Sequence, residues 1–173
     1  MNRPERHPSA AHGAALADLA ERPDGVLEAI AEKHGLSVRE VVDLLPSHAA
    51  VRVAAGHFDE VWEEIRGWGE VMFLVHGRNG VFEIRSALPA GTHGRGYFNI
   101  HGDVPLGGHL RIDRLADIVF VDRPFFGRRS LSVQFFDADG DTMFKIFVAR
   151  DATRELDAVQ TAKFETARRR FGA

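Results

Sequence analysis

The feature that most constrains the fold is a change of hydrophobic period near residue 70. Between residues 70 and 150, apolar and polar residues alternate in seven short stretches: VMFLVH, VFEIRSAL, GYFNIHG, LGGHLRID, ADIVFVD, SLSVQFF and MFKIFVA. A period of two predicts β-strands, and connections such as GRNG and DADGD are too short for parallel crossovers. We therefore predict a curved, largely antiparallel sheet of about seven strands over residues 70–150.

Helical patterns precede this strand segment. Over residues 14–69 the apolar residues recur at three- and four-residue spacing, and Ser37 with Glu40 matches a capping box. The aromatic residues of HFDEVWEEIRGWG fall on one helical face, which we interpret as core rather than as a cofactor site. Two short helices before Pro46 resemble a helix-turn-helix, but the second, SVREVVDLLP, has a single basic side chain. We therefore favour a structural helix pair over DNA binding.

The two ends of the chain complete the predicted architecture. Residues 152–170 have the spacing of a helix that packs on the sheet, whereas residues 1–13 are polar, contain two prolines and predict a loose tail. Antiparallel strands flanked by helices are typical of the α+β class. We predict a single α+β domain over residues 1–173.

Composition excludes several classes of function. The chain has no cysteine, which excludes disulfides, thiolate zinc sites and thiol nucleophiles, and a net charge of −3 gives no general attraction to nucleic acid. The N-terminus lacks the apolar core of a signal peptide, and no apolar run is long enough to cross a bilayer. Motifs such as HExxH, GxSxG and the Walker loop are absent. We expect a cytoplasmic protein that is not an enzyme, with no membrane insertion and no nucleic-acid partner.

The hairpin around the only tyrosine carries the remaining chemistry. If residues 96–102 pair with residues 106–112, Asn99 lies opposite His109 and one face of the hairpin is apolar. The other face then carries six residues: Tyr97, Asn99, His101, Gly107, His109 and Arg111. This face is either the solvent side of an antiparallel sheet or a ligand surface, and the residues alone leave both open.

A ligand surface of this composition suits haem. A phenolate is a hard oxygen donor for ferric iron, and haem iron accepts tyrosine in some proteins. A histidine could serve as a second iron ligand, and Arg95 and Arg111 could pair with the haem propionates.

Long segments of the chain resemble the haem-utilisation cytosolic carrier proteins of the HutX, ChuX and HugX family. The resemblance is carried by WGEVMFLVH, GTHGRGYFNIHG and RPFFGRRSLSVQFFDADGDTMFKIFVARD, and it extends over roughly residues 24–165. It implies an intracellular homodimer that binds one ferric protoporphyrin IX haem per subunit. It also implies that imported haem is delivered to a haem-degrading partner for iron utilisation.

The resemblance also implies roles for individual residues. Tyr97 matches the proposed iron ligand of the family, and His76 and His109 match histidines tied to haem binding. Where some relatives have a second histidine this chain has Arg95, so His93 or His101 would replace it, or Tyr97 would act alone. Two alternatives to a carrier remain: a haem-degrading enzyme, and a DNA-binding regulator that uses residues 24–46.

Overall fold

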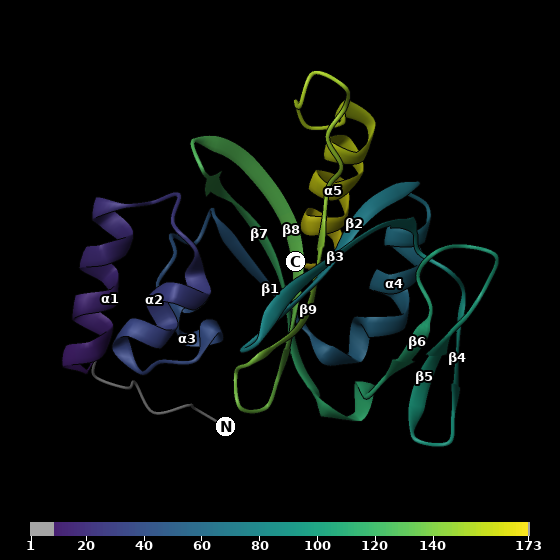
Figure 1. Cartoon of the computed structure of the whole chain (residues 1–173), viewed down its shortest axis with the longest axis horizontal. Helices are drawn as coiled ribbons and strands as arrows, with labels where there is room; N and C mark the ends of the chain where they lie inside the picture. The colour runs from purple at the N-terminus through teal and green to yellow at the C-terminus, as the bar shows by residue number, and fades with distance from the viewer. Residues whose placement is uncertain (1–8, 173) are drawn as a thin grey trace.

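The computed structural model describes residues 9–172 and confirms the mixed α+β class (Figure 1). Its centre is a six-stranded sheet with the strand order β1-β7-β8-β9-β2-β3, and a separate three-stranded sheet has the order β4-β5-β6. All of these pairs are antiparallel. Figure 1 shows helices α1–α3 on one side of the large sheet, with the small sheet and α4 on the other.

The large sheet consists of β1 (Ala50–Ala54), β2 (Glu70–Gly77), β3 (Gly80–Ala87), β7 (Leu115–Phe125), β8 (Arg128–Asp137) and β9 (Thr142–Phe147). The small sheet consists of β4 (Gly91–Gly94), β5 (Tyr97–Ile100) and β6 (Gly108–Leu110). The helices are α1 (Ala10–Glu21), α2 (Leu27–His34), α3 (Val38–Asp43), α4 (Phe58–Arg66) and α5 (Ala158–Phe171), with short 3-10 turns at Ala55–His57 and Ile112–Arg114.

All seven predicted strands are present, but the structure adds two more and divides the strands between two sheets. Strand β1 lies inside the segment 14–69 that we predicted to be helical, because AVRVA pairs along β7 from Ala50 opposite Val121. Strand β4 lies in a predicted connection and is formed by pairing with β5, which places Gly94 opposite Tyr97. Short segments of this kind become strands through their partners rather than through their own propensity.

The predicted boundaries at the two ends also shift. Helix α1 begins at Ala10 because Ser9 caps it, so the last part of the predicted tail 1–13 is helical, and residues 1–8 lie outside the described residues. The C-terminal helix begins at Ala158 rather than at residue 152, because Asp157 is the N-cap and accepts from the backbone amide of Gln160.

The main core forms where α4 and α5 pack on the large sheet. Phe58 and Trp62 of α4 are buried, as the aromatic spacing predicts, and both contact the ring of Phe98 from the small sheet. The ring centroids lie 4.9 Å and 5.4 Å from that of Phe98, in edge-to-face geometry. Trp62 Nε1 also donates to the backbone carbonyl of Pro89 at 2.9 Å. Each such aromatic pair contributes about 0.5–1.5 kcal/mol beyond burial, so the small sheet is fastened to α4.

A second core forms between α1–α3 and the other face of the large sheet. Buried residues of the three helices pack on Val119, Val121 and Phe136. The capping box of Ser37 and Glu40 is present at the start of α3. The single basic side chain of that helix, Arg39, pairs with a carboxylate of β7, so the predicted helix pair serves to cover the sheet. No helix in the described residues is long and apolar enough to span a membrane.

Candidate functional site

The hairpin of β5 and β6 has the register that the sequence predicted. Asn99 lies opposite His109, and Phe98 lies opposite Leu110. Phe98 is buried in the α4 core, and successive strand residues point to opposite faces, so Tyr97 and Asn99 point outward. We call the outward side, with Tyr97, Asn99, His109 and Arg111, the tyrosine face.

The phenol of Tyr97 is accessible and has two polar neighbours. The residue is 40% exposed. Its ring meets the ring of His109 edge-on with the centroids 5.9 Å apart, and the guanidinium carbon of Arg111 lies 5.6 Å from the Tyr97 centroid. The tyrosine face therefore brings together an oxygen donor, an imidazole and a cation, as predicted. It is an open surface, since Tyr97 lines none of five cavities in the described part of the chain.

The hydrogen bonds that Asn99 makes determine which ring nitrogen of His109 carries the proton. The amide Nδ2 of Asn99 donates to the carbonyls of Thr92 and Gly94, each at 3.1 Å. Its Oδ1 therefore faces Nδ1 of His109, at 2.7 Å. An amide oxygen only accepts, so Nδ1 carries the proton and Nε2 of the neutral ring keeps a free lone pair. A histidine oriented in this way is suited to bind a metal through Nε2.

The cation of the tyrosine face already has a partner. Arg111 donates from Nε and Nη2 to the two carboxylate oxygens of Asp113, at 2.8 Å and 2.6 Å. This fork, with a smaller contribution from Tyr97, raises the pKa of Arg111, and the same contact lowers the pKa of the Asp113 carboxyl. A propionate that approaches Arg111 therefore has to compete with Asp113.

The remaining predicted residues near the hairpin have different positions. Arg95 is exposed at the tip between β4 and β5, in a two-residue turn where both Arg95 and Gly96 have positive φ angles, 54° and 80°. His101 is exposed just beyond the end of β5. His93 lies opposite Phe98, on the face turned away from Tyr97, and its Nε2 lies 2.8 Å from a carboxylate oxygen of Asp59 in α4.

His76 is not part of the tyrosine face. It lies on β2, where its Nδ1 is 3.4 Å from Oε1 of Glu28 in α2. Figure 1 shows α2 and β5 on opposite sides of the large sheet. The structure therefore brings Tyr97, His109 and Arg111 together and places His76 elsewhere.

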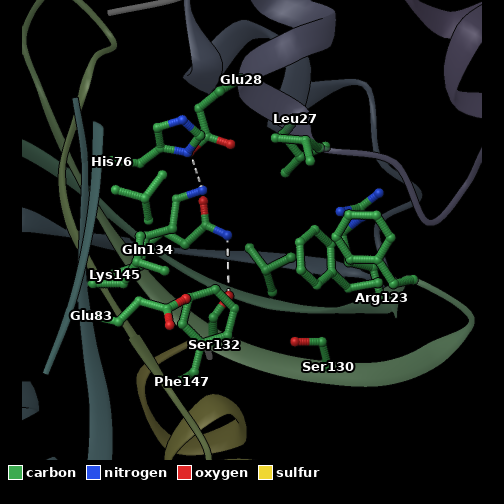
Figure 2. Close-up of a pocket in the computed structure, with 16 residues that line it drawn as sticks. Leu27, Glu28, His76, Glu83, Arg123, Ser130, Ser132, Gln134, Lys145 and Phe147 are labelled. Carbon is green, nitrogen blue, oxygen red and sulfur yellow. Dashed lines mark hydrogen bonds and ion pairs between the residues drawn. The ribbon is translucent and has the colours of Figure 1, made fainter. Parts of the chain in front are cut away.

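His76 lines a cavity of about 340 Å³ between α2 and the large sheet. At one end of this cavity Glu28 and Lys145 form an ion pair, and Arg123 lies at the other end (Figure 2). Lys145 is only 5% exposed. Burial disfavours both charges, but the attraction of Lys145 and its hydrogen bond outweigh burial at Glu28 and lower its pKa.

The polar groups of this cavity were missed by the sequence analysis. Arg123, Gln134 and Lys145 are all buried on the face of the large sheet that α2 covers. One signal was available, because Gln134 and Lys145 interrupt the apolar stretches SVQFF and MFKIF. A polar side chain inside such a strand predicts either an exposed face or a buried polar partner. The structure shows the second.

Neither region is a ready-made metal centre. No group of three or more histidine, aspartate or glutamate side chains in residues 9–172 is arranged to hold a metal ion.

Comparison with known proteins gives a family match and a similar sequence. Residues 51–167 match the family model described as haem utilisation ChuX/HutX. The intracellular heme transport protein HutX of Vibrio cholerae is 33% identical over 148 residues, which cover 85% of this chain and 77% of that protein.

Solved structures give the same result. A crystal structure of a protein from Agrobacterium tumefaciens is 50% identical, with a TM-score of 0.86 and coverage of 93% of this chain and 91% of that one. A structure of the heme binding protein ChuX is 35% identical, with a TM-score of 0.82 and coverage of 90% and 97%.

Proposed function

Because this chain belongs to the ChuX/HutX family of haem-utilisation proteins, we propose that it is an intracellular haem carrier in which Tyr97 binds the iron. The observation that carries this proposal is the tyrosine face. The only phenol of the chain is accessible there, beside an imidazole and a guanidinium. Phe98 anchors this face to α4, so its position does not depend on a mobile loop.

The residues present fit ferric haem as a cargo. The phenolate of Tyr97 is a hard anionic donor that prefers ferric iron, and reduction of the iron weakens that bond. The free Nε2 of His109 offers a second donor on the same face, so the iron can change ligand without leaving the surface. Arg111, and Arg95 at the tip of the hairpin, supply positive charge for the propionates.

Titration of the full chain with ferric haem tests the iron ligand. We expect Tyr97→Phe to change the Soret band and to weaken binding by about tenfold to a hundredfold, the range found when groups that support a bound metal are lost. His76→Gln is the matched control because it removes a histidine of the cavity instead. If His76→Gln abolishes binding and Tyr97→Phe leaves affinity and spectrum unchanged, the iron site lies in the cavity and the assignment of Tyr97 is wrong.

We further propose that the chain delivers haem to a haem-degrading acceptor and does not degrade it. An open face leaves the bound haem accessible to another protein, and the described residues provide no enclosed chamber at Tyr97. We expect haem-loaded protein to pass haem to apomyoglobin, with myoglobin absorbance as the readout. Incubation with ascorbate in air should leave the porphyrin intact, whereas a bilin spectrum would identify an enzyme.

We also propose a homodimer. Strand β3 is an edge of the large sheet, and Phe82 is 69% exposed beside its cross-strand partner Val75, which is also exposed. An unpaired edge with exposed apolar side chains is typical of an interface. Light scattering should show a dimer for the wild type and a monomer for Phe82→Glu. A wild type that stays monomeric at high concentration would contradict the proposal.

A further inference from the structure

The tyrosine face contains an ion pair that engages its cation. Both carboxylate oxygens of Asp113 accept hydrogen bonds from Arg111, one from Nε at 2.8 Å and the other from Nη2 at 2.6 Å. The central carbon of the same guanidinium lies 5.6 Å from the centre of the Tyr97 ring. The guanidinium beside the phenol is therefore already bound to a carboxylate of its own chain.

An ion pair in this position is easily displaced. The side chain of Arg111 is 49% exposed and that of Asp113 is 52% exposed, so water solvates both charges when they separate. Exposed ion pairs contribute little to stability, because solvent screens the attraction and two side chains have to be held in one geometry. A second carboxylate that approaches Arg111 can therefore replace Asp113 at small cost.

The backbone around Asp113 keeps its carboxylate in place when Arg111 leaves. Asp113 lies in the 3-10 turn Ile112–Arg114, where the amide of Arg114 donates to the carbonyl of Arg111 at 3.0 Å. Arg111 chiefly, and Arg114 to a smaller extent, lower the pKa of the Asp113 carboxyl. The carboxylate thus retains a cationic neighbour, whereas the longer side chain of Arg111 is free to swing toward the phenol.

A haem bound through Tyr97 would bring carboxylates of the same chemistry to this place. A propionate presents a pair of oxygens like those of Asp113, so it can accept the same forked bonds from Nε and Nη2 of Arg111. Once the iron is held by Tyr97 the propionate is tethered, and its effective concentration near Arg111 is high. Asp113 is tethered as well, so the two carboxylates compete for one guanidinium.

We propose that Asp113 is a displaceable counter-ion that sets the affinity and the release rate of the cargo, an inference that rests on the haem-carrier function proposed above. Arg111 leaves Asp113 for a propionate when haem binds, and it returns to Asp113 when haem departs. Because one ion pair replaces another, the contact with the propionate orients the haem but adds little net affinity. This balance suits a carrier that has to release what it binds.

Soret titration with ferric haem and transfer of the haem to apomyoglobin test the proposal in the full chain. We expect Asp113→Asn to raise haem affinity and to slow transfer, each by about twofold to fivefold, the range that corresponds to an exposed ion pair. Asp103→Asn is the matched control, because it removes an exposed carboxylate from the loop of the same hairpin. It should change neither value.

Two further measurements isolate the propionate. Haem dimethyl ester lacks the propionate charges, so Asp113→Asn should leave its affinity unchanged. The Nε–H resonance of Arg111 in nitrogen NMR gives a readout that does not depend on transfer. It should move when Asp113 is replaced by Asn, and it should also move when the wild type binds gallium protoporphyrin, a diamagnetic substitute for ferric haem.

Failure of this inference is distinguishable from failure of the proposed function. If Tyr97→Phe weakens haem binding but Asp113→Asn binds and transfers haem like the wild type, only the role of Asp113 is wrong. If Tyr97→Phe binds haem like the wild type, the tyrosine face is not the haem site and both proposals are wrong. Weaker binding in folded Asp113→Asn, an equal gain in Asp103→Asn, or an equal gain with the dimethyl ester would each overturn the competition with the propionate.

Discussion

The tyrosine face and the cavity under α2 are built in opposite ways. On the tyrosine face, polar residues from one short hairpin lie in the open, with Tyr97 40% exposed, and their neighbours are set by strand register. In the cavity, Lys145 is 5% exposed and its partner Glu28 comes from a helix more than a hundred residues away in sequence. The first arrangement leaves polar groups accessible to solvent. In the second, the ion pair of Glu28 and Lys145 joins a helix to the sheet. The same sheet therefore separates an exposed polar surface from an ionic contact that fixes the fold.

The largest expected effect tests the structural side of this comparison. Glu28→Gln leaves Lys145 buried without a counter-ion, and breaking a buried pair in this way costs about 3–5 kcal/mol of unfolding free energy. Urea denaturation measures the change. The double variant Glu28→Gln/Lys145→Met removes both charges and should recover most of the loss. A change below about 0.5 kcal/mol in the single variant would mean that the pair does not anchor α2.

A smaller effect tests how the tyrosine face is organised. Asn99→Ala removes the acceptor that fixes the proton of His109 on Nδ1, so the ring can turn and haem affinity should fall by about tenfold. Thr92→Val on the neighbouring strand is the matched control, because Asn99 uses only the backbone carbonyl of Thr92. Soret titration compares the two variants. Equal affinities would show that His109 does not contact the haem.

Lowering the pH should test whether the carboxylate charge of Glu28 stabilises the fold. The pKa of Glu28 is lowered in the fold from its ordinary value of 4.5, so its contribution is complete above that pH and is lost as the pH falls through the folded value. One proton changes stability by at most about 1.4 kcal/mol per pH unit. The gap between wild type and Glu28→Gln should therefore narrow below pH 4.5, as measured by urea unfolding at each pH. A constant gap would show that the cost does not come from the carboxylate charge.

The smallest expected effect concerns Tyr97 itself. Because the side chain is exposed and its ring remains in place, Tyr97→Phe should change the unfolding free energy by less than about 0.5 kcal/mol. Thermal and urea unfolding of the haem-free protein give this number. A loss above 2 kcal/mol, on the scale of a buried-group substitution, would mean that the hydroxyl stabilises the fold and that its part in haem binding is indirect.

The sequence was sufficient to predict the secondary structure and the hairpin register wherever a short-range pattern determines them. Alternation gave the seven main strands, and the register of one hairpin gave the Asn99–His109 pair and the outward direction of Tyr97. The aromatic spacing of α4 correctly indicated core. The use of these residues in haem binding stays a prediction, because the fold alone does not test it.

The sequence was not sufficient where a strand or a side-chain contact depends on residues that are far apart in the chain. The glycine-rich GTHG is a strand only because β5 lies beside it, and AVRVA only because β7 does. His76 and Tyr97 share no local pattern that shows they lie on opposite sides of a sheet. Lys145, Glu28 and Arg123 meet in one cavity although they come from β9, α2 and β7. Their pairing is a property of the tertiary fold.

The exposure of the hairpin surface has a consequence for the rate at which a bound molecule is transferred to another protein. A molecule enclosed in a chamber can leave only after some part of the chamber moves, and that movement then limits how fast it is passed on. Cargo resting against Tyr97 would meet the next protein directly, so the exchange rate should depend on how often the two proteins collide and not on any gate within this one.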